Sequence, residues 1–345
     1  NNEVSAIVAT GTISLTANSG TIIGDNDAVK DLEVTGAGAV TLAAKAIGPA
    51  TTTRITIDAD TASTLLTVDS NATTDGEDVN LVVISGDFLA VTITQLLAET
   101  DIDITLAGSG DVIDIDGSAP AIPIVDVDVD AGATNLTYTL EQASHNIAIT
   151  DINIGAGNLV ITADSGNITV TAGATGIAGT TGNVTLTADG VGILTAAAPI
   201  TLSGVGSVII LQADDDVIFT AAGDVTVGAL STAAFTITAN LDNSGGANQG
   251  AITMVDGTII NAGAGTITMS AAEDIAIGSV QTNNTSATSI SITTTLGAIT
   301  DAGDTGGADI DASTGEITLS AVTGIGSGNA LEITAGALDI TNTTS

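Results

Sequence analysis

The chain lacks cysteine and tryptophan, and its 345 residues include only three phenylalanines, one tyrosine and one histidine. A globular core of this length normally depends on large aromatic side chains. The apolar 44% of this sequence consists almost entirely of Ala, Val, Ile and Leu. We therefore expect thin, regular layers in which small branched side chains are buried. The absence of cysteine is compatible with secretion without disulfide bonds.

Basic residues are nearly absent too. Lys30, Lys45 and Arg54 are the only three, against 40 acidic residues, and the formal net charge is −37. Nucleic acids and anionic lipid surfaces are bound mainly through cationic side chains, so neither is an expected partner. The sequence also has no apolar run near the roughly 18–20 residues that a membrane helix needs, so we expect no membrane insertion.

One short phrase recurs from end to end: an apolar residue, Thr or Ser, an apolar residue, Thr or Ser, then Ala. Strict alternation of this kind predicts a strand with one buried and one exposed face. No segment of helical length keeps an i, i+3, i+4 pattern, so we expect very little helix. The clearest copies are Ile13–Ala17, Ile168–Ala172, Val184–Ala188, Ile267–Ala271 and Ile317–Ala321.

Many short, evenly spaced strands fit either a series of β-sandwiches or a β-solenoid. A sandwich needs some aromatic filling, whereas stacked coils tolerate a narrow aliphatic interior. We therefore predict an all-β, right-handed parallel β-helix of about 12–15 coils. No composition shift divides residues 1–345, so we expect one solenoid with a protruding loop near 240–250. Because no capping segment is evident, it would be a fragment of a longer protein or a subunit that stacks end to end.

Three copies of the phrase begin with Gly-Asn: GNLVITA at Gly157–Ala163, GNITVTA at Gly166–Ala172 and GNVTLTA at Gly182–Ala188. These copies resemble the repeats of filamentous haemagglutinin-type exoproteins, which are large secreted adhesins built as right-handed β-helices. The resemblance implies an extracellular, cell-surface rod with a structural or adhesive role. Its partners would be host or cell-surface ligands, or further copies of itself. A self-assembling filament or surface-layer subunit is the alternative.

Acidic residues alternate along three segments, which places them on one face of each expected strand. The first and third segments begin 25 residues apart, about one coil, so their acids could stack on adjacent rungs. Stacked carboxylates repel unless a cation bridges them, and their oxygens suit Ca²⁺. A solvated acidic face is the plainer interpretation. GGADIDA at Gly306–Ala312 lacks the third glycine of the calcium-binding β-roll repeat. The candidate metal ligands are Asp101, Asp103, Asp114, Asp116, Asp126, Asp128 and Asp130.

Many β-helices are pectin lyases or polygalacturonases, which need basic or histidine residues and bind anionic sugars. Past Arg54, His145 is the only residue of that kind, and we interpret it as a loop residue. Carboxylate pairs alone could hydrolyse a glycoside, so a carbohydrate-active enzyme stays an alternative, although we expect no enzyme. Rows of threonine, such as Thr185 with Thr187, suggest binding to ice or another flat lattice. Interruptions by Ser, Glu, Asp and Val argue against it.

Overall fold

The computed structural model describes residues 2–4, 7–25, 30–49, 53–59, 65–70, 78–85, 90–95, 102–106, 112–116, 124–128, 135–140, 146–232, 234–240, 250–305 and 307–343. Every regular element in these ranges is a β-strand, which confirms the all-β prediction. The strands stack, mostly parallel, as a β-solenoid. The chain forms two compact units, Asn1–Asp164 and Ser165–Ser345. The prediction that residues 1–345 form one uninterrupted solenoid stays a prediction.

Unit 1 contains fifteen strands, β1 to β15, in two stacked columns. One column runs β1, β3, β5, β7, β9, β13, β15, and all of its pairings are parallel. The other runs β2, β4, β6, β8, β10, β11, β12, β14. The bounds are β1 (Asn2–Val4), β2 (Ile7–Ala9), β3 (Ile13–Gly24), β4 (Leu32–Val34), β5 (Ala39–Ile47), β6 (Ile55–Ala59), β7 (Leu65–Ser70), β8 (Val79–Ser85), β9 (Ala90–Gln95), β10 (Ile102–Leu106), β11 (Val112–Asp116), β12 (Ile124–Asp128), β13 (Asn135–Leu140), β14 (Ile147–Asn153) and β15 (Leu159–Ala163).

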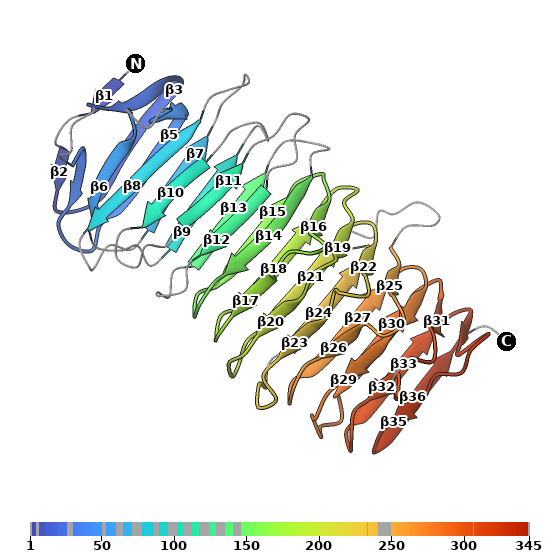
Figure 1. Ribbon diagram of the computed structural model, residues 1–345. Coiled ribbons are helices and arrows are strands. Elements are labelled where there is room, and N and C mark those ends of the chain that lie inside the picture. The colour runs from blue at the N-terminus through green and yellow to red at the C-terminus, as the bar shows by residue number, and fades with distance from the viewer. Residues whose placement is uncertain are drawn as a thin grey trace. The chain divides into compact units, whose positions relative to one another are not determined.

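Unit 2 contains three columns of strands, because each coil makes three strands there instead of two (Figure 1). Column A is β18, β21, β24, β27, β30, β33, β36; column B is β16, β19, β22, β25, β28, β31, β34; column C is β17, β20, β23, β26, β29, β32, β35. The bounds are β16 (Ile168–Val170), β17 (Gly176–Gly179), β18 (Val184–Ala188), β19 (Leu194–Ala196), β20 (Ile200–Leu202), β21 (Ile209–Ala213), β22 (Val217–Phe219), β23 (Val225–Val227), β24 (Ala234–Ala239), β25 (Ile252–Met254), β26 (Ile259–Asn261), β27 (Thr266–Ala271), β28 (Ile275–Ile277), β29 (Ser279–Gln281), β30 (Ile290–Thr294), β31 (Ala298–Asp301), β32 (Ile310–Asp311), β33 (Glu316–Ala321), β34 (Gly324–Ile325), β35 (Ile333–Thr334) and β36 (Ala337–Asn342).

The interior of unit 2 consists of stacked aliphatic rows, as the alternating phrase predicts. In column A, Val184 pairs with Ile209, which pairs with Phe235, and all three side chains are buried. A coil of column A therefore takes about 25 residues. Fully burying one such side chain stabilises the fold by about 1.5–3 kcal/mol. Repetition of these rows compensates for the scarcity of aromatic residues.

The two neighbouring copies of the Gly-Asn phrase belong to different columns. GNITVTA contains β16, which pairs with β19 in column B, whereas GNVTLTA contains β18, which pairs with β21 in column A. Their separation of sixteen residues is shorter than one coil because it spans two of the three faces within a coil.

One expectation about the coils needs correction. β11 pairs antiparallel with both β10 and β12, so this stretch does not continue the parallel repeat. The expected loop near 240–250 falls at 241–249, outside the described residues.

Candidate metal centre

Several of the described coils are tied to the next by an Asn or Asp at the start of a strand. Asn167 precedes β16, and its Oδ1 accepts a hydrogen bond from the backbone N–H of Ile193, which precedes β19, at 2.8 Å. Asn183 does the same for the N–H of Val208 at 2.8 Å. The asparagine of the Gly-Asn phrase is therefore a tie between coils, which satisfies a backbone donor where the ladder begins. In the same way, backbone N–H groups of the following coil donate to the carboxylates of Asp216, Asp224, Asp274 and Asp309.

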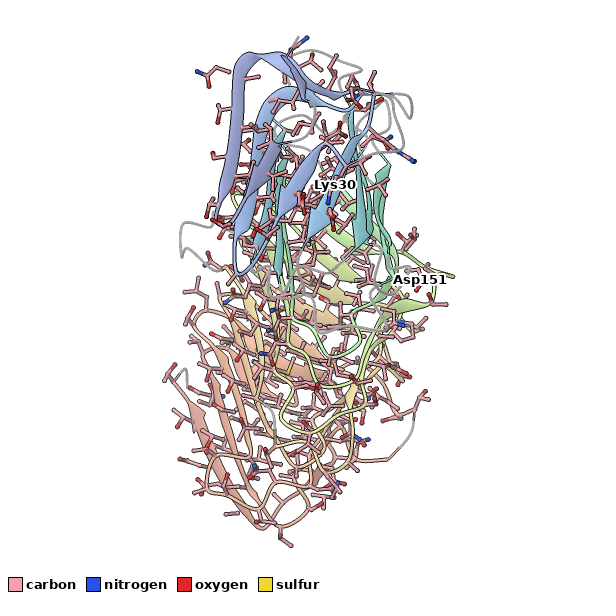
Figure 2. The ribbon with its side chains drawn as sticks, turned by 90° about the vertical axis from the view of Figure 1, so that its left-hand side faces the viewer. Lys30 and Asp151 are labelled. Carbon is pink, nitrogen blue, oxygen red and sulfur yellow. The ribbon has the colours of Figure 1, made fainter. Side chains whose placement is uncertain are left out.

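The predicted acidic residues of unit 1 are only partly brought together. Pairing of β10, β11 and β12 places Asp103 opposite Asp114, and Asp114 opposite Asp126. β12 then pairs with β14, which puts Asp126 opposite Asp151, an exposed residue that the sequence analysis did not single out (Figure 2). The first and third acidic segments are thus not on adjacent rungs as expected, because β11 lies between them. Asp103, Asp114, Asp126 and Asp151 form one backbone row, here called the acidic row.

The remaining candidates lie elsewhere. Asp116 pairs with Ile124 and Asp128 with Val112, so neither faces another acid across the β11–β12 ladder. Asp101 and Asp130 lie outside the described residues, as does His145. The acidic row therefore retains three of the seven predicted ligands.

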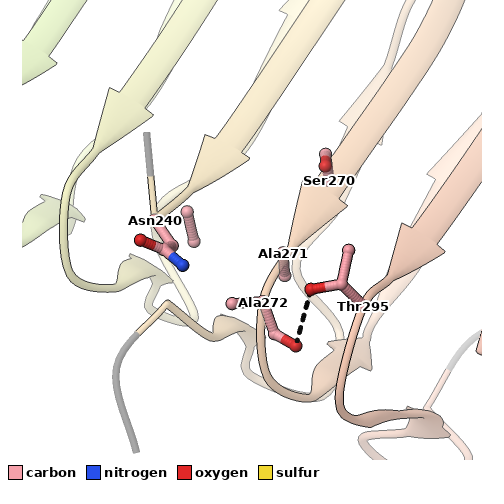
Figure 3. Close-up of a pocket in the computed structure, with 6 residues that line it drawn as sticks. Asn240, Ser270, Ala271, Ala272 and Thr295 are labelled. Atoms are coloured by element: carbon pink, nitrogen blue, oxygen red, sulfur yellow. Dashed lines mark hydrogen bonds between the residues drawn. The ribbon is translucent and has the colours of Figure 1, made fainter. Parts of the chain in front are cut away.

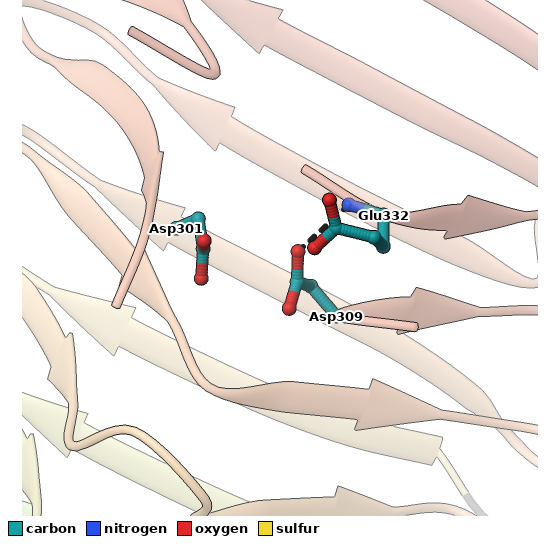
Figure 4. A group of neighbouring side chains, drawn as sticks. All are labelled: Asp301, Asp309 and Glu332. Carbon is teal, nitrogen blue, oxygen red and sulfur yellow. Dashed lines mark hydrogen bonds between the residues drawn. The ribbon is translucent and has the colours of Figure 1, made fainter. Parts of the chain in front are cut away.

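A second acidic group was not predicted. One carboxylate oxygen from each of Asp301, Asp309 and Glu332 lies within 4.8 Å of the other two (Figure 4). Asp301 ends β31, Asp309 directly precedes β32, and Glu332 directly precedes β35 on the next coil. We call these three residues the acidic triad. It forms at the corner between columns B and C, so it joins two successive coils.

Burial distinguishes the members of the triad. Asp309 is only 3% exposed, and its Oδ2 accepts the backbone N–H of Glu332 at 2.8 Å. Asp301 accepts the N–H of Gly303 through Oδ1 at 2.8 Å, while its Oδ2 is buried without a hydrogen-bond partner. Burial, then the charges of Asp301 and Glu332 and a side-chain hydrogen bond with Glu332, together raise the pKa of Asp309 to about 6, although the hydrogen bond from the Glu332 N–H acts in the opposite direction. The ionised form of Asp309 is therefore energetically unfavourable in this structure.

Unit 2 itself has no cationic side chain to compensate that charge. From residue 165 to 345 the sequence contains no Lys, Arg or His. In unit 1, Lys30 is already engaged: its Nζ lies 2.8 Å from Asp58 Oδ2 and 2.9 Å from Glu33 Oε1 (Figure 2). Hydrogen bonds from Lys30 to Asp58, then to Glu33, raise its pKa. Three hard oxygen ligands without a counter-charge are what a divalent cation such as Ca²⁺ or Mg²⁺ binds.

The sequence carried a partial signal for the triad. Asp309 lies within GGADIDA, where the missing glycine argued against a calcium repeat. Glu332 is 23 residues after Asp309, close to one coil, at the equivalent position before a column C strand. Asp301 is not related to them by this spacing: it ends β31, and the structure brings it to the same corner.

A small cavity offers a further recess in unit 2. It has a volume of about 100 Å³ and is lined by Ala239, Asn240, Ser270, Ala271, Ala272 and Thr295 (Figure 3). This volume suits a few water molecules, below the roughly 300 Å³ of typical ligand pockets. No titratable residue lines it, so it offers no groups for acid–base chemistry.

Comparisons with known proteins give no relative: no family model, no curated protein and no solved structure matches the chain. The described residues include no helix of the length and apolarity needed to cross a membrane.

Proposed function

We propose that the protein is an extracellular structural or adhesive rod displayed on a cell surface. The observation that carries this proposal is the stacking of coils through in-register ladders, as in column A of unit 2. Such coils extend by repetition and present long, regular outer faces. The resemblance of the Gly-Asn phrases to filamentous haemagglutinin-type repeats agrees with a secreted adhesin.

The residues on the outer face suit binding to another surface better than they suit catalysis. In column A, outward positions carry small hydroxyl residues, such as Thr236 beside Thr268 and Thr268 beside Ser291. A basic residue, needed for lyase chemistry, does not occur after Arg54. We therefore propose host or cell-surface ligands, or further copies of the chain, as partners, and no enzymatic reaction.

Calcium binding along the acidic row is part of the proposal. Adjacent strands lie about 4.8 Å apart, so carboxylates in register on three or four strands would repel without a bound cation. The register of Asp103, Asp114 and Asp126 supports this arrangement. An Asp114→Asn/Asp126→Asn variant should bind less Ca²⁺ by calorimetry, and equal binding would contradict the role of the row.

Electron microscopy of the purified protein tests the rod. Short single rods would support an adhesin, uniform fibres would favour the filament or surface-layer alternative, and compact globules would contradict both. Antibody labelling of intact source cells tests the location: labelling only after the cells are broken would overturn surface display.

A further inference from the structure

We propose that Asp301, Asp309 and Glu332 bind one divalent cation of the calcium class, which ties the last two described coils together. This site is separate from the acidic row and does not depend on the adhesive role. Asp301 and Asp309 belong to the coil of β30, β31 and β32, and Glu332 belongs to the coil of β33, β34 and β35. An ion between them would bridge the two coils.

The spacing of the ligands suits the ion. Ca²⁺ binds oxygens at about 2.3–2.6 Å, so two ligands on opposite sides of one ion are at most about 5 Å apart. The three oxygens, within 4.8 Å of one another, are all within reach of a single Ca²⁺. Mg²⁺ demands near-ideal octahedral geometry, whereas Ca²⁺ accepts irregular sets of oxygen ligands. We therefore expect the triad to favour Ca²⁺.

An independent observation points to a ligand at this corner. Asp301 Oδ2 is shielded from solvent and accepts no hydrogen bond, although buried carboxylate oxygens normally have a donor. Oδ1 of the same carboxylate already accepts the Gly303 N–H. Rotating the carboxylate would therefore exchange the two oxygens and still leave one of them without a donor. A cation would satisfy this oxygen and also the charge of the almost fully buried Asp309.

The surrounding loops hold the ligands in place without using the triad's free oxygens. Thr305 donates to both carboxylate oxygens of Asp256, at 3.0 Å from its N–H and 2.7 Å from its hydroxyl. Asn329 Nδ2 donates to Asp304 Oδ1 at 3.1 Å, which links the connection after β31 to the one before β35. Both connections that carry the triad are thus anchored, and an incoming ion need not order them.

The test measures Ca²⁺ binding by the full chain after chelator treatment, by calorimetry and by the shift in melting temperature. The variants are Asp309→Asn and Glu332→Gln, with Glu316→Gln on β33 as the matched control outside the triad. We expect Ca²⁺ to raise the melting temperature of the wild type and the control, and to do so more than Mg²⁺. In the two triad variants, affinity at this site should fall about tenfold or more, because each loses one of three charged ligands.

The outcomes separate the triad from the acidic row. An unchanged Ca²⁺ response in both Asp309→Asn and Glu332→Gln would overturn the proposal, even if the wild type binds calcium elsewhere. If a variant does not fold, hydrogen exchange on the wild type decides: Ca²⁺ should slow exchange in 302–310 and 329–334. No change in those segments at millimolar Ca²⁺ would refute the site.

Discussion

Replacing Asn167 with alanine removes one tie between two coils while leaving the aliphatic interior unchanged. Asn167 Oδ1 accepts the backbone N–H of Ile193 at 2.8 Å, and the bond is partly buried. A net protein hydrogen bond contributes about 0.5–1.5 kcal/mol. Unit 2 spans Ser165–Ser345, and a domain of that size loses about 2–4 °C in melting temperature per kcal/mol. We therefore expect Asn167→Ala to lower the melting temperature by about 1–6 °C.

Asn167→Asp is the matched control, because it keeps an acceptor oxygen at the same position. Aspartate already makes the equivalent bond at Asp224, whose Oδ1 accepts Ile259 N–H at 2.8 Å. Thermal unfolding followed by circular dichroism should place Asn167→Asp close to the wild type. A combined Asn167→Ala/Asn183→Ala variant should lose about twice as much, since the two ties lie on different columns. The role of the tie would be refuted if Asn167→Ala melted at the same temperature as the wild type. It would also be refuted if Asn167→Asp lowered the melting temperature as much as Asn167→Ala.

Three further outcomes follow from the same structure. Phe219 is fully buried in register between Ala196 and Met254, so Phe219→Ala should cost about 3–5 kcal/mol in urea unfolding; a loss below about 1 kcal/mol would show that the row can close the cavity. Ile168→Asp on the buried face of β16 should prevent folding of its coil, whereas Thr169→Asp on the outer face should melt normally; similar melting would contradict the assigned faces. Burial, then the charge of Asp216, raises the pKa of Asp215, and its Oδ1 is buried without a partner. A raised carboxyl pKa destabilises the fold at pH above that pKa and not below the unfolded value. Asp215→Asn should therefore stabilise the fold at pH 7, and the gain should vanish as pH falls towards 4; a gain independent of pH would contradict this account.

The strand pattern could be predicted from sequence because its cause is local. Alternation of apolar and hydroxyl residues fixes which side chains of a strand share a face, and the buried positions of β16 and β18 agree with it. The scarcity of aromatic residues likewise excluded a thick core. The Gly-Asn phrase marked strand starts correctly, although the tie made by its asparagine was not foreseen.

The candidate metal ligands were harder to predict because their neighbours are set by strand pairing. The spacing of Asp101 and Asp126 suggested adjacent rungs, but β11 inserts between their strands by antiparallel pairing. The acidic triad combines one residue at a strand end with two before strands, and its members lie up to 31 positions apart in the sequence. No alternation links Asp301 to the other two.

The sequence by itself determined that this chain forms stacked strands with an aliphatic interior, a polar outer face and almost no positive charge. Those properties depend on residue type and on a period of two, which any short stretch of the chain expresses. The tertiary structure decided how many strands make a coil, where the parallel repeat is broken and which carboxylates meet. Those outcomes depend on the length and path of the connections, which determine the partner of each strand and which local alternation does not encode.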